Sequence, residues 1–374
     1  MDDGAVQPAH SFRVETAGRA SRGAWAAAAL GILLTLVLLP AFAGRNIIQD
    51  LIFLFYMLAL AQCWNLLAGY AGLISVGQQT FVGFGGYLLF ALSLLGGINP
   101  LLAIPIAGLI SAIFALPTAL VVFRLRGAYF AIGTWVMAEV YRLVFAQFKA
   151  LGGGTGASLA PSVTSSVPGI EWVKTLFDVR TPAARDIVSY WVALALMAGT
   201  LAFVYLILRS RRGLALGAIR DHEGAAAGLG VDIYRIKLAV YVATAAVTGM
   251  VGALIYLQKA RISPDAAFSV LDWTAYVIFI TVIGGIGTME GPVVGAIIFY
   301  LMQRYLADFG AAYLILLGAL GILVILFAPK GLWGLISERH DLTLFPTRRR
   351  LVIPTRNGDH GEQQANSITI KQYD

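Results

Sequence analysis

The chain alternates long apolar stretches with short polar breaks, a pattern typical of a protein built from membrane-spanning helices. One stretch, Leu51–Phe123, runs for 73 residues without Asp, Glu, Lys, Arg or His. A transmembrane helix needs about 20 apolar residues, so this stretch alone has room for about three spans. We therefore expect an all-α polytopic membrane fold with about ten transmembrane helices. Hydropathy and helix-breaking residues place them at 24–43, 47–68, 73–95, 101–122, 128–148, 187–208, 238–257, 271–286, 292–308 and 312–328.

Glycine-rich segments interrupt this pattern at two places, Gly69–Gly86 and Gly284–Gly295. A break in a membrane helix frees backbone groups that only protein or a wet cavity can satisfy, and such breaks indicate substrate sites in transporters. Close helix packing through small residues is the alternative. The candidates for a translocation path are Trp64, Asn65, Ser75, Gln78, Gln79, Thr80, Gly284, Gly285 and Gly287.

A compact charged island, Arg209–Lys237, lies between two apolar spans and holds six Arg or Lys and three Asp or Glu. A short basic loop of this kind stays in the cytoplasm. Its centre is typical of a small amphipathic docking helix, stopped by Gly230. At the helical period, Leu216, Ile219, Ala226 and Leu229 share one face, and Arg220 and Asp221 point away.

Charge placement also predicts the orientation and the domains. A cytoplasmic N-terminus puts the charged island, Arg124, Arg126 and Lys330 inside, and an even number of spans puts both termini there. Residues 24–338 then form the transmembrane domain, with a cytoplasmic coupling loop at 209–237 and a long external loop at 149–186. Residues 1–23 and 339–374 are polar tails that we expect to be disordered. The apolar run 24–43 exceeds the roughly 7–15 residues of a secretory signal, so we expect a retained first helix.

Composition supports the membrane assignment and excludes several other classes. The chain is 59% hydrophobic and 13% charged, whereas soluble domains average roughly 45–50% and 25%. A net charge of +7 also suits nucleic-acid binding, but these basic residues flank apolar spans, so we expect a bilayer and no nucleic acid. The single cysteine, Cys63, and four scattered histidines give no metal-ligand spacing. No Walker A, GxSxG or HExxH pattern occurs, so we expect no cofactor and no catalytic residue.

A few ionisable residues fall inside the predicted spans. Glu139 and Arg142 are three residues apart and able to pair on one helix face. Asp272 opens one span and Arg304 lies near the end of another. Charges within a membrane suggest a functional role by default, and the alternative is a structural or interfacial ion pair.

Five sequence blocks in order carry a family resemblance. They are WNLLAGYAGLISVGQQTFVGFGGY at 64–87, LRGAYFAIGT at 125–134, RRGLALGAIRDHEGAAAGLGVDIYRIKLAVYVATAAVTGMVGAL at 211–254, VIGGIGTMEGPVVGA at 282–296 and LFAPKGLWGL at 326–335. Over roughly 51–335 the chain resembles the LivM-type permease subunits of branched-chain amino acid ABC importers. The resemblance implies a bacterial inner-membrane protein, a second homologous permease subunit forming a heterodimer, two ABC ATPase subunits and an extracytoplasmic solute-binding protein.

The resemblance also implies roles for particular residues. Part of the island is similar to the loop through which importer permeases dock on their ATPases, and the coupling residues are Leu216, Ile219, Arg220, Asp221, His222, Glu223, Ala225, Ala226, Leu229 and Gly230. Gly224 replaces the first alanine of the usual Glu-Ala-Ala, which lowers helix propensity slightly. Gln78 stands where many relatives have histidine, so the role of that polar cluster does not transfer directly.

The expected function is import of branched-chain amino acids by alternating access, with ATP hydrolysed by a partner and no reaction catalysed by this chain. An importer of urea or short amides shares the architecture and is the alternative within the class. A stand-alone secondary carrier or channel is the alternative from another class.

Overall fold

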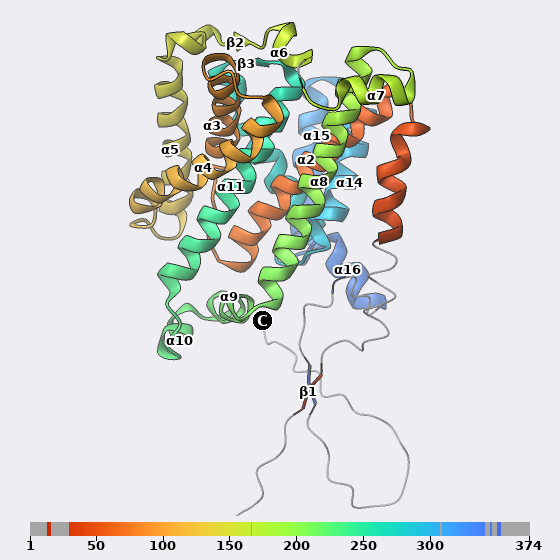
Figure 1. Cartoon of the computed structure of the whole chain (residues 1–374). Coiled ribbons are helices and arrows are strands. Elements are labelled where there is room, and N and C mark those ends of the chain that lie inside the picture. The colour runs from red at the N-terminus through yellow and green to blue at the C-terminus, as the bar shows by residue number, and fades with distance from the viewer. Residues whose placement is uncertain are drawn as a thin grey trace, which may run out of the picture. The chain divides into compact units, whose positions relative to one another are not determined.

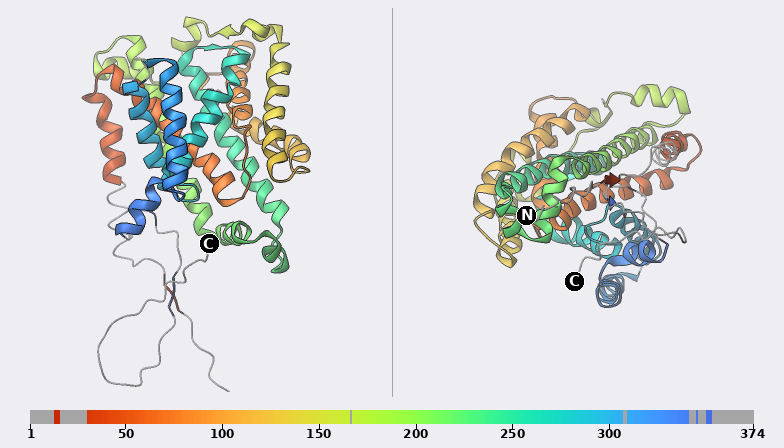
Figure 2. Two further views of the ribbon diagram at one scale, coloured as in Figure 1. Left: turned by 180° about the vertical axis from the view of Figure 1, so that it is seen from behind. Right: turned by 90° about the horizontal axis from the view of Figure 1, so that it is seen from below.

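The computed structural model describes residues 13–15, 30–165, 167–306, 309–340, 345 and 350–352. The chain divides into two units, one comprising residues 34–345 and the other residues 1–33 and 346–374. The larger unit is a helical bundle, drawn in Figures 1 and 2. It carries the predicted path and coupling residues.

The helices follow one another with short connections. A first apolar helix, Leu30–Ala41, precedes α2. The long helices are α2 (Arg45–Asn65), α3 (Gln79–Phe90), α4 (Pro100–Val122), α5 (Ala128–Ala146), α8 (Thr181–Arg209), α11 (Ile233–Lys259), α13 (Tyr276–Gly284), α14 (Gly291–Leu306) and α15 (Ala311–Phe327). The shorter ones are α6 (Pro161–Ser165), α7 (Ile170–Phe177), α9 (Arg211–Asp221), α10 (Glu223–Gly228), α12 (Pro264–Ala267) and α16 (Gly331–His340).

Each predicted span overlaps a helical segment, although residues 73–78 of the third span are not helical, and residues 24–29 and 307–308 lie outside the described residues. Within the described part of the chain, five helical stretches are long and apolar enough to cross a membrane. They are Arg45–Tyr70, Pro100–Val122, Thr181–Arg209, Ile233–Lys259 and Pro264–Gly284. A sixth results if α15 and α16, which meet at 41°, count as one bent span. The structure therefore supports an all-α polytopic fold, and the expected total of about ten spans is not confirmed.

The predicted break in the third span is present. Helix α2 continues into a wider π-helical turn, Leu66–Tyr70, and the chain then runs without regular structure until α3 begins at Gln79. Gly72, with φ of 67°, reverses the chain after that turn, a backbone conformation that favours glycine. Most of the interrupted segment is buried, although Gly72 and Ile74 are exposed, and burial in protein is where irregular backbone is tolerated in a membrane protein.

Small residues allow the central helices to approach closely. Helix α11 packs along both α3 and α4, and α2 packs along α8. A Cβ on Gly85 of α3 would collide with the carbonyl oxygen of Gly249 in α11, so a larger residue there would separate these two helices. This packing through glycine compensates for the missing hydrophobic driving force between helices in lipid.

The two ends of the bundle carry different elements. At one end, the loop predicted to be external contains α6, α7 and strand β2 (Ala157–Ser158), which pairs antiparallel with β3 (Arg261–Ile262) after α11. At the other end lie α9, α10 and α16 (Figure 1). The predicted coupling loop and the predicted external loop are therefore at opposite ends of the same bundle.

The described part of the smaller unit comprises helical residues 30–33 and one pair of strands. Strands β1 (Arg13–Glu15) and β4 (Arg350–Val352) pair antiparallel, with Val14 opposite Leu351. The rest of the predicted polar tails, apart from α16 and Phe345, lies outside the described residues. Their predicted disorder stays a prediction.

Candidate functional site

The charged island folds into two short helices that meet at a corner. Ser210 caps α9 by accepting a hydrogen bond from the Arg212 N–H (3.2 Å). His222 has an extended backbone (φ −159°, ψ 106°), and its Nδ1 accepts from the Ala225 N–H (3.1 Å), which makes it the N-cap of α10. Gly230, with φ of 80°, ends α10, and the Val231 N–H donates to the Ala226 carbonyl (3.1 Å). This C-terminal pattern confirms the predicted stop at Gly230.

The expectation of one continuous amphipathic helix is wrong at His222. A side chain that bonds to its own following backbone gives the chain an alternative to continuing the helix. The helical period therefore does not run through the corner. Leu216, Ile219 and Ala226 are buried as predicted, at 0%, 4% and 1% exposure, but Leu229 is 80% exposed.

The corner is anchored on its apolar side and open on its polar side. Leu216 packs in a buried cluster with Leu66, Leu67 and Met289, which joins α9 to the inner end of α2. Glu223, 56% exposed at its side chain, forms an ion pair with Lys237 of α11 (2.9 Å). The outward surface of the corner consists of the other predicted coupling residues, Arg220, Asp221, His222, Glu223, Ala225, Leu229 and Gly230. The corner is therefore packed against the bundle on its apolar side, and its polar side is exposed; we call these exposed residues the rim.

The loop between α13 and α14 lies directly behind this corner. The Asn65 side chain accepts from the Gly287 N–H (2.8 Å) and donates to the Thr288 carbonyl (2.7 Å). One turn earlier on α2, Gln62 donates to the Met289 carbonyl (2.7 Å). Arg220 of α9 donates to the Gly287 carbonyl (3.4 Å). We call the set Gln62, Asn65 and residues 287–289 the amide latch, and it ties the coupling corner to α2.

Side chains satisfy the backbone of the interrupted segment between α2 and α3. Trp64 donates from its indole N–H to the Ser75 carbonyl (2.8 Å). The Val76 N–H donates to the Thr134 hydroxyl of α5 (3.0 Å). The Ser75 hydroxyl accepts from the Gly77 N–H (3.1 Å). This explains how unpaired backbone is accommodated in the centre of the bundle.

The predicted polar cluster at the start of α3 is packed inside the bundle. Gln78 donates to the Thr248 hydroxyl of α11 (3.2 Å), and Gln79 bonds through its backbone and side chain to Thr274. Gln78, Gln79 and Thr80 are 4%, 0% and 2% exposed. Gln78 and the side-chain oxygen of Gln79 are bonded to protein, whereas the side-chain nitrogen of Gln79 has no partner among the described residues, and the role of this cluster in a path stays a prediction.

The second glycine-rich segment forms the turn between α13 and α14. A Cβ on Gly284 would collide with the Gly291 carbonyl, and one on Gly295 with the Ile280 carbonyl. Gly285 and Gly287 have φ of 131° and 75°, conformations that favour glycine. The close packing considered as the alternative is thus present at Gly284, while the path role of Gly284, Gly285 and Gly287 stays a prediction.

The structure adds polar residues that sequence reasoning missed. Gln62, Thr134, Thr248 and Thr274 supply the partners described above, and all four are buried. Gln62 stands three residues before Asn65, so the helical period places both amides on one face of α2. This spacing could have identified Gln62 from the sequence as a neighbour of Asn65. The threonines are single polar positions within apolar spans, and their partners lie far away in the sequence.

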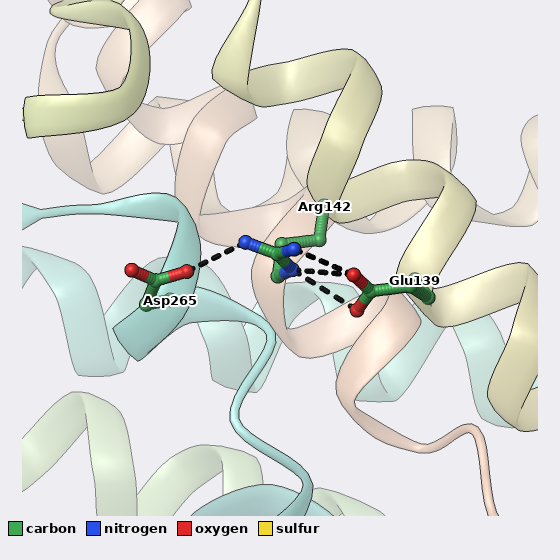
Figure 3. Close-up of polar contacts among 3 residues, drawn as sticks. All are labelled: Glu139, Arg142 and Asp265. Carbon is green, nitrogen blue, oxygen red and sulfur yellow. Dashed lines mark hydrogen bonds and ion pairs between the residues drawn. The ribbon is translucent and has the colours of Figure 1, made fainter.

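The predicted pair of Glu139 and Arg142 is present and has a third member (Figure 3). Arg142 of α5 donates to both carboxylate oxygens of Glu139, with N–O distances of 2.5–3.0 Å. Its Nη1 donates to Asp265 of α12 (2.6 Å). We call these three residues the α5 triad. In the same way Arg304 pairs with Asp50, which also accepts from the Tyr300 hydroxyl (3.0 Å).

Comparisons with known proteins identify a family of membrane permeases. The family described as "Branched-chain amino acid transport system / permease component" matches residues 46–326. The chain is 30% identical over 333 residues to the high-affinity branched-chain amino acid transport system permease protein LivM of Escherichia coli, covering 79% of this chain and 77% of that protein. It is 24% identical over 272 residues to a probable LivH permease of Methanocaldococcus jannaschii, covering 69% and 82%. No solved structure matches.

The apolar helical bundle, with five helical stretches long enough to cross a membrane among the described residues, is that of a multi-pass membrane protein. The chain belongs to the branched-chain amino acid transport permease family, since the family match covers most of its length. It is accordingly a multi-pass membrane protein whose relatives are transport subunits.

Proposed function

We propose that this chain is a transmembrane permease subunit of an ATP-driven importer for branched-chain aliphatic amino acids. Two separate ABC ATPase subunits bind the α9–α10 corner, a second homologous permease subunit completes the membrane unit, and an extracytoplasmic binding protein delivers substrate. Movement of the corner on ATP binding rocks the helices between two access states. The permease itself makes and breaks no covalent bond.

The α9–α10 corner is the observation that carries this proposal. Its buried Leu216 and Ile219 fix it to the bundle, and its rim is exposed. The amide latch gives the corner a hydrogen-bonded connection to α2, next to the interrupted span. A partner that displaces α9 would therefore act, through Gly287 and Asn65, on the interrupted segment between α2 and α3.

Charge and topology support an inner-membrane orientation with both termini in the cytoplasm. The basic island contains α9 and α10, and Arg124, Arg126 and Lys330 lie in two other connections that this orientation places inside. Pairing of β1 with β4 requires both terminal segments to be on one side of the membrane. An even number of crossings satisfies this requirement.

Similarity to two kinds of permease supports a paired membrane unit. The chain matches proteins named LivM and also one named LivH. Related subunits assemble most simply about a two-fold or pseudo-two-fold axis, so each contributes an equivalent surface.

The test is a coupling measurement on the assembled transporter in proteoliposomes. Glu223→Arg and Leu229→Asp change the exposed rim, so we expect ATP hydrolysis to lose its dependence on substrate-loaded binding protein and leucine uptake to fall about tenfold or more. Membrane insertion stays normal because neither residue is buried. Lys174→Glu, a charge reversal in the predicted external loop, is the control.

Three outcomes bear on the proposal. Wild-type uptake in the rim variants contradicts ATPase docking at this corner. Full-rate uptake without any ATPase favours a stand-alone carrier or channel. ATP-dependent uptake of urea or acetamide but not of leucine favours the amide importer.

A further inference from the structure

Glu290 is a buried carboxylate that directly follows the latch residues 287–289. Its side chain lies in a residue that is only 7% exposed. Its main-chain carbonyl accepts from the Val293 and Val294 N–H groups, so Glu290 stands at the N-terminus of α14, where the helix dipole favours a negative charge. A charge removed from water is costly unless it is hydrogen-bonded, so the donor to this carboxylate matters for the stability of the turn.

That donor comes from the C-terminal part of the chain. The Phe345 N–H donates to the Glu290 Oε1 (2.9 Å), across 55 positions of sequence. Phe345 follows α16, which ends at His340. Hydrogen bonds from a backbone N–H to an ionised carboxylate are roughly twice as strong as neutral ones. Phe345 is therefore bonded to the same turn that receives Arg220 and Asn65.

The Phe345 ring contacts the other side of the α9–α10 corner. Its centroid is 6.3 Å from that of Tyr205 in α8, and it packs against the buried cluster that contains Leu216 of α9. The Tyr205 hydroxyl accepts from Arg209 (2.9 Å), whose guanidinium lies 5.4 Å from the Tyr205 ring centroid. Arg209 ends α8, and the next residue, Ser210, caps α9. Phe345 thus contacts the place where the corner begins.

Helix α9 is held at both ends, and Phe345 connects the two holding points. The first end follows the contact of Tyr205 with Arg209, and the last turn is held by the bond of Arg220 to Gly287. Phe345 contacts the first point through its ring and the turn at the second point through its N–H. Because the ring and the N–H belong to one residue, a shift of the α8–α9 junction relative to the turn cannot keep both contacts.

We propose that Phe345 and Glu290 form an autoinhibitory clasp, which holds the α9–α10 corner in its resting position and must open before the corner moves. The resting and displaced positions differ in these contacts, so the clasp favours the resting position by their free energy. The inference rests on the proposed function, because the clasp restrains the corner on which the ATPase subunits act. Its consequence is slow ATP hydrolysis when no substrate-loaded binding protein is present.

The clasp differs from the amide latch in how easily it opens. Phe345 is half-buried, whereas Asn65 and Gln62 of the latch are 0% exposed. Elements that move in coupling are drawn from the weakly held parts of a structure. Opening the clasp exposes one aromatic ring and one carboxylate and leaves the buried amides of the latch bonded. The clasp is therefore the contact that yields first when the corner is displaced.

The first experiment measures ATP hydrolysis by the complete transporter in proteoliposomes without binding protein. Phe345→Ala removes the ring and keeps the N–H, and we expect the rate to rise about fivefold, the lower end of typical coupling between sites. Phe345→Leu keeps much of the apolar volume and should lie between Phe345→Ala and the wild type. Ile336→Ala, at an exposed position of α16, is the matched control and should equal the wild type.

The carboxylate gives an independent measurement in the same assay. Glu290→Gln keeps an acceptor but removes the charge, so we expect the rate without binding protein to rise about twofold. The double variant with Phe345→Ala should rise by less than the product of the two single effects, because both changes open the same clasp. Damage to the fold would instead lower ATP hydrolysis and leucine uptake together.

The third experiment locks the clasp shut. The double variant Tyr205→Cys, Phe345→Cys is cross-linked in the complete transporter with a short bis-methanethiosulfonate. We expect leucine uptake and the ATP hydrolysis stimulated by binding protein to stop, and a thiol reductant to restore both. The native Cys63 is buried, and the two single cysteine variants treated with the same reagent are the controls.

The outcomes separate the clasp from the proposed function. Unchanged hydrolysis in both Phe345→Ala and Glu290→Gln, a joint fall of hydrolysis and uptake, or full uptake by the cross-linked transporter overturns the clasp, while ATP-dependent leucine uptake by the wild type still upholds the function. An equal rise in Ile336→Ala also overturns the clasp. Absence of wild-type uptake contradicts the function itself. If Phe345→Ala does not assemble, the rate of Glu290→Gln and the cross-link decide.

Discussion

The bundle has two polar regions, the amide latch with its neighbouring glutamines and the α5 triad, and they differ in what their side chains bind. The latch binds backbone: Asn65 and Gln62 are 0% exposed and their bonds go to residues 287–289. The triad binds only other charged side chains and is exposed. Polar groups inside an apolar span thus have two distinct uses, and burial together with the identity of the partner distinguishes them.

The difference teaches that polarity alone does not locate a substrate path. The Asn65 amide bonds to peptide groups through both its nitrogen and its oxygen, so it stabilises one arrangement of helices. A guanidinium with two carboxylates on an outer surface has donors left over and needs water or a ligand. We therefore expect variants of the latch to change stability, and variants of the triad to change stability little.

The largest change in stability is expected at the latch. Asn65→Leu leaves the Gly287 N–H and the Thr288 carbonyl without their partner, which costs roughly 1–3 kcal/mol in the free energy of unfolding. The measurement is thermal unfolding of the purified transporter in detergent. Gln147→Leu, at the exposed end of α5, is the control and should leave the midpoint unchanged. An unchanged unfolding midpoint for Asn65→Leu would mean that the latch does not stabilise the fold.

A smaller change is expected where the interrupted segment meets α5. Thr134→Val keeps the shape of the side chain but removes the acceptor for the Val76 N–H. The loss should be about 1 kcal/mol, as for a single hydrogen bond. Thr134→Ser, which keeps the hydroxyl, should lie close to wild type in the same unfolding assay. Equal values for the two variants would contradict the role of this bond.

The smallest change in stability is expected at the triad. The double variant Glu139→Gln, Arg142→Gln breaks an exposed ion pair, and such pairs contribute below about 1 kcal/mol. Its unfolding midpoint should match that of Lys174→Gln, which breaks the exposed pair of Lys174 with Glu171. A drop as large as that of Asn65→Leu would erase the distinction between the two regions.

The positions of the helices follow from hydropathy because burying or embedding apolar side chains outweighs other terms along each span. The interruption before Gln79 was also predictable, since six glycines in 69–86 mark it. The pair of Glu139 with Arg142 follows from local spacing, whereas Asp265 joins it across 123 positions of sequence and left no local signal.

The coupling corner shows the limit of a periodic pattern. Leu229 has the right spacing for the buried face, but the capping bond of His222 to Ala225 changes the direction of the chain first. A single side-chain bond therefore altered the exposure of a leucine seven residues later. The contact of Arg220 with Gly287 was likewise hidden, because it joins two segments that no spacing rule relates.

The turn at Gly287 connects the α9–α10 corner to α2, so it bears on how far these two parts can move separately. Its carbonyl accepts from Arg220, its N–H donates to Asn65, and its positive φ leaves little choice of residue. The backbone groups of this single glycine therefore connect Arg220 of the corner directly to Asn65 of α2. On the proposed mechanism, we therefore expect a displacement of α9 to reach the Asn65 end of α2 through this one glycine.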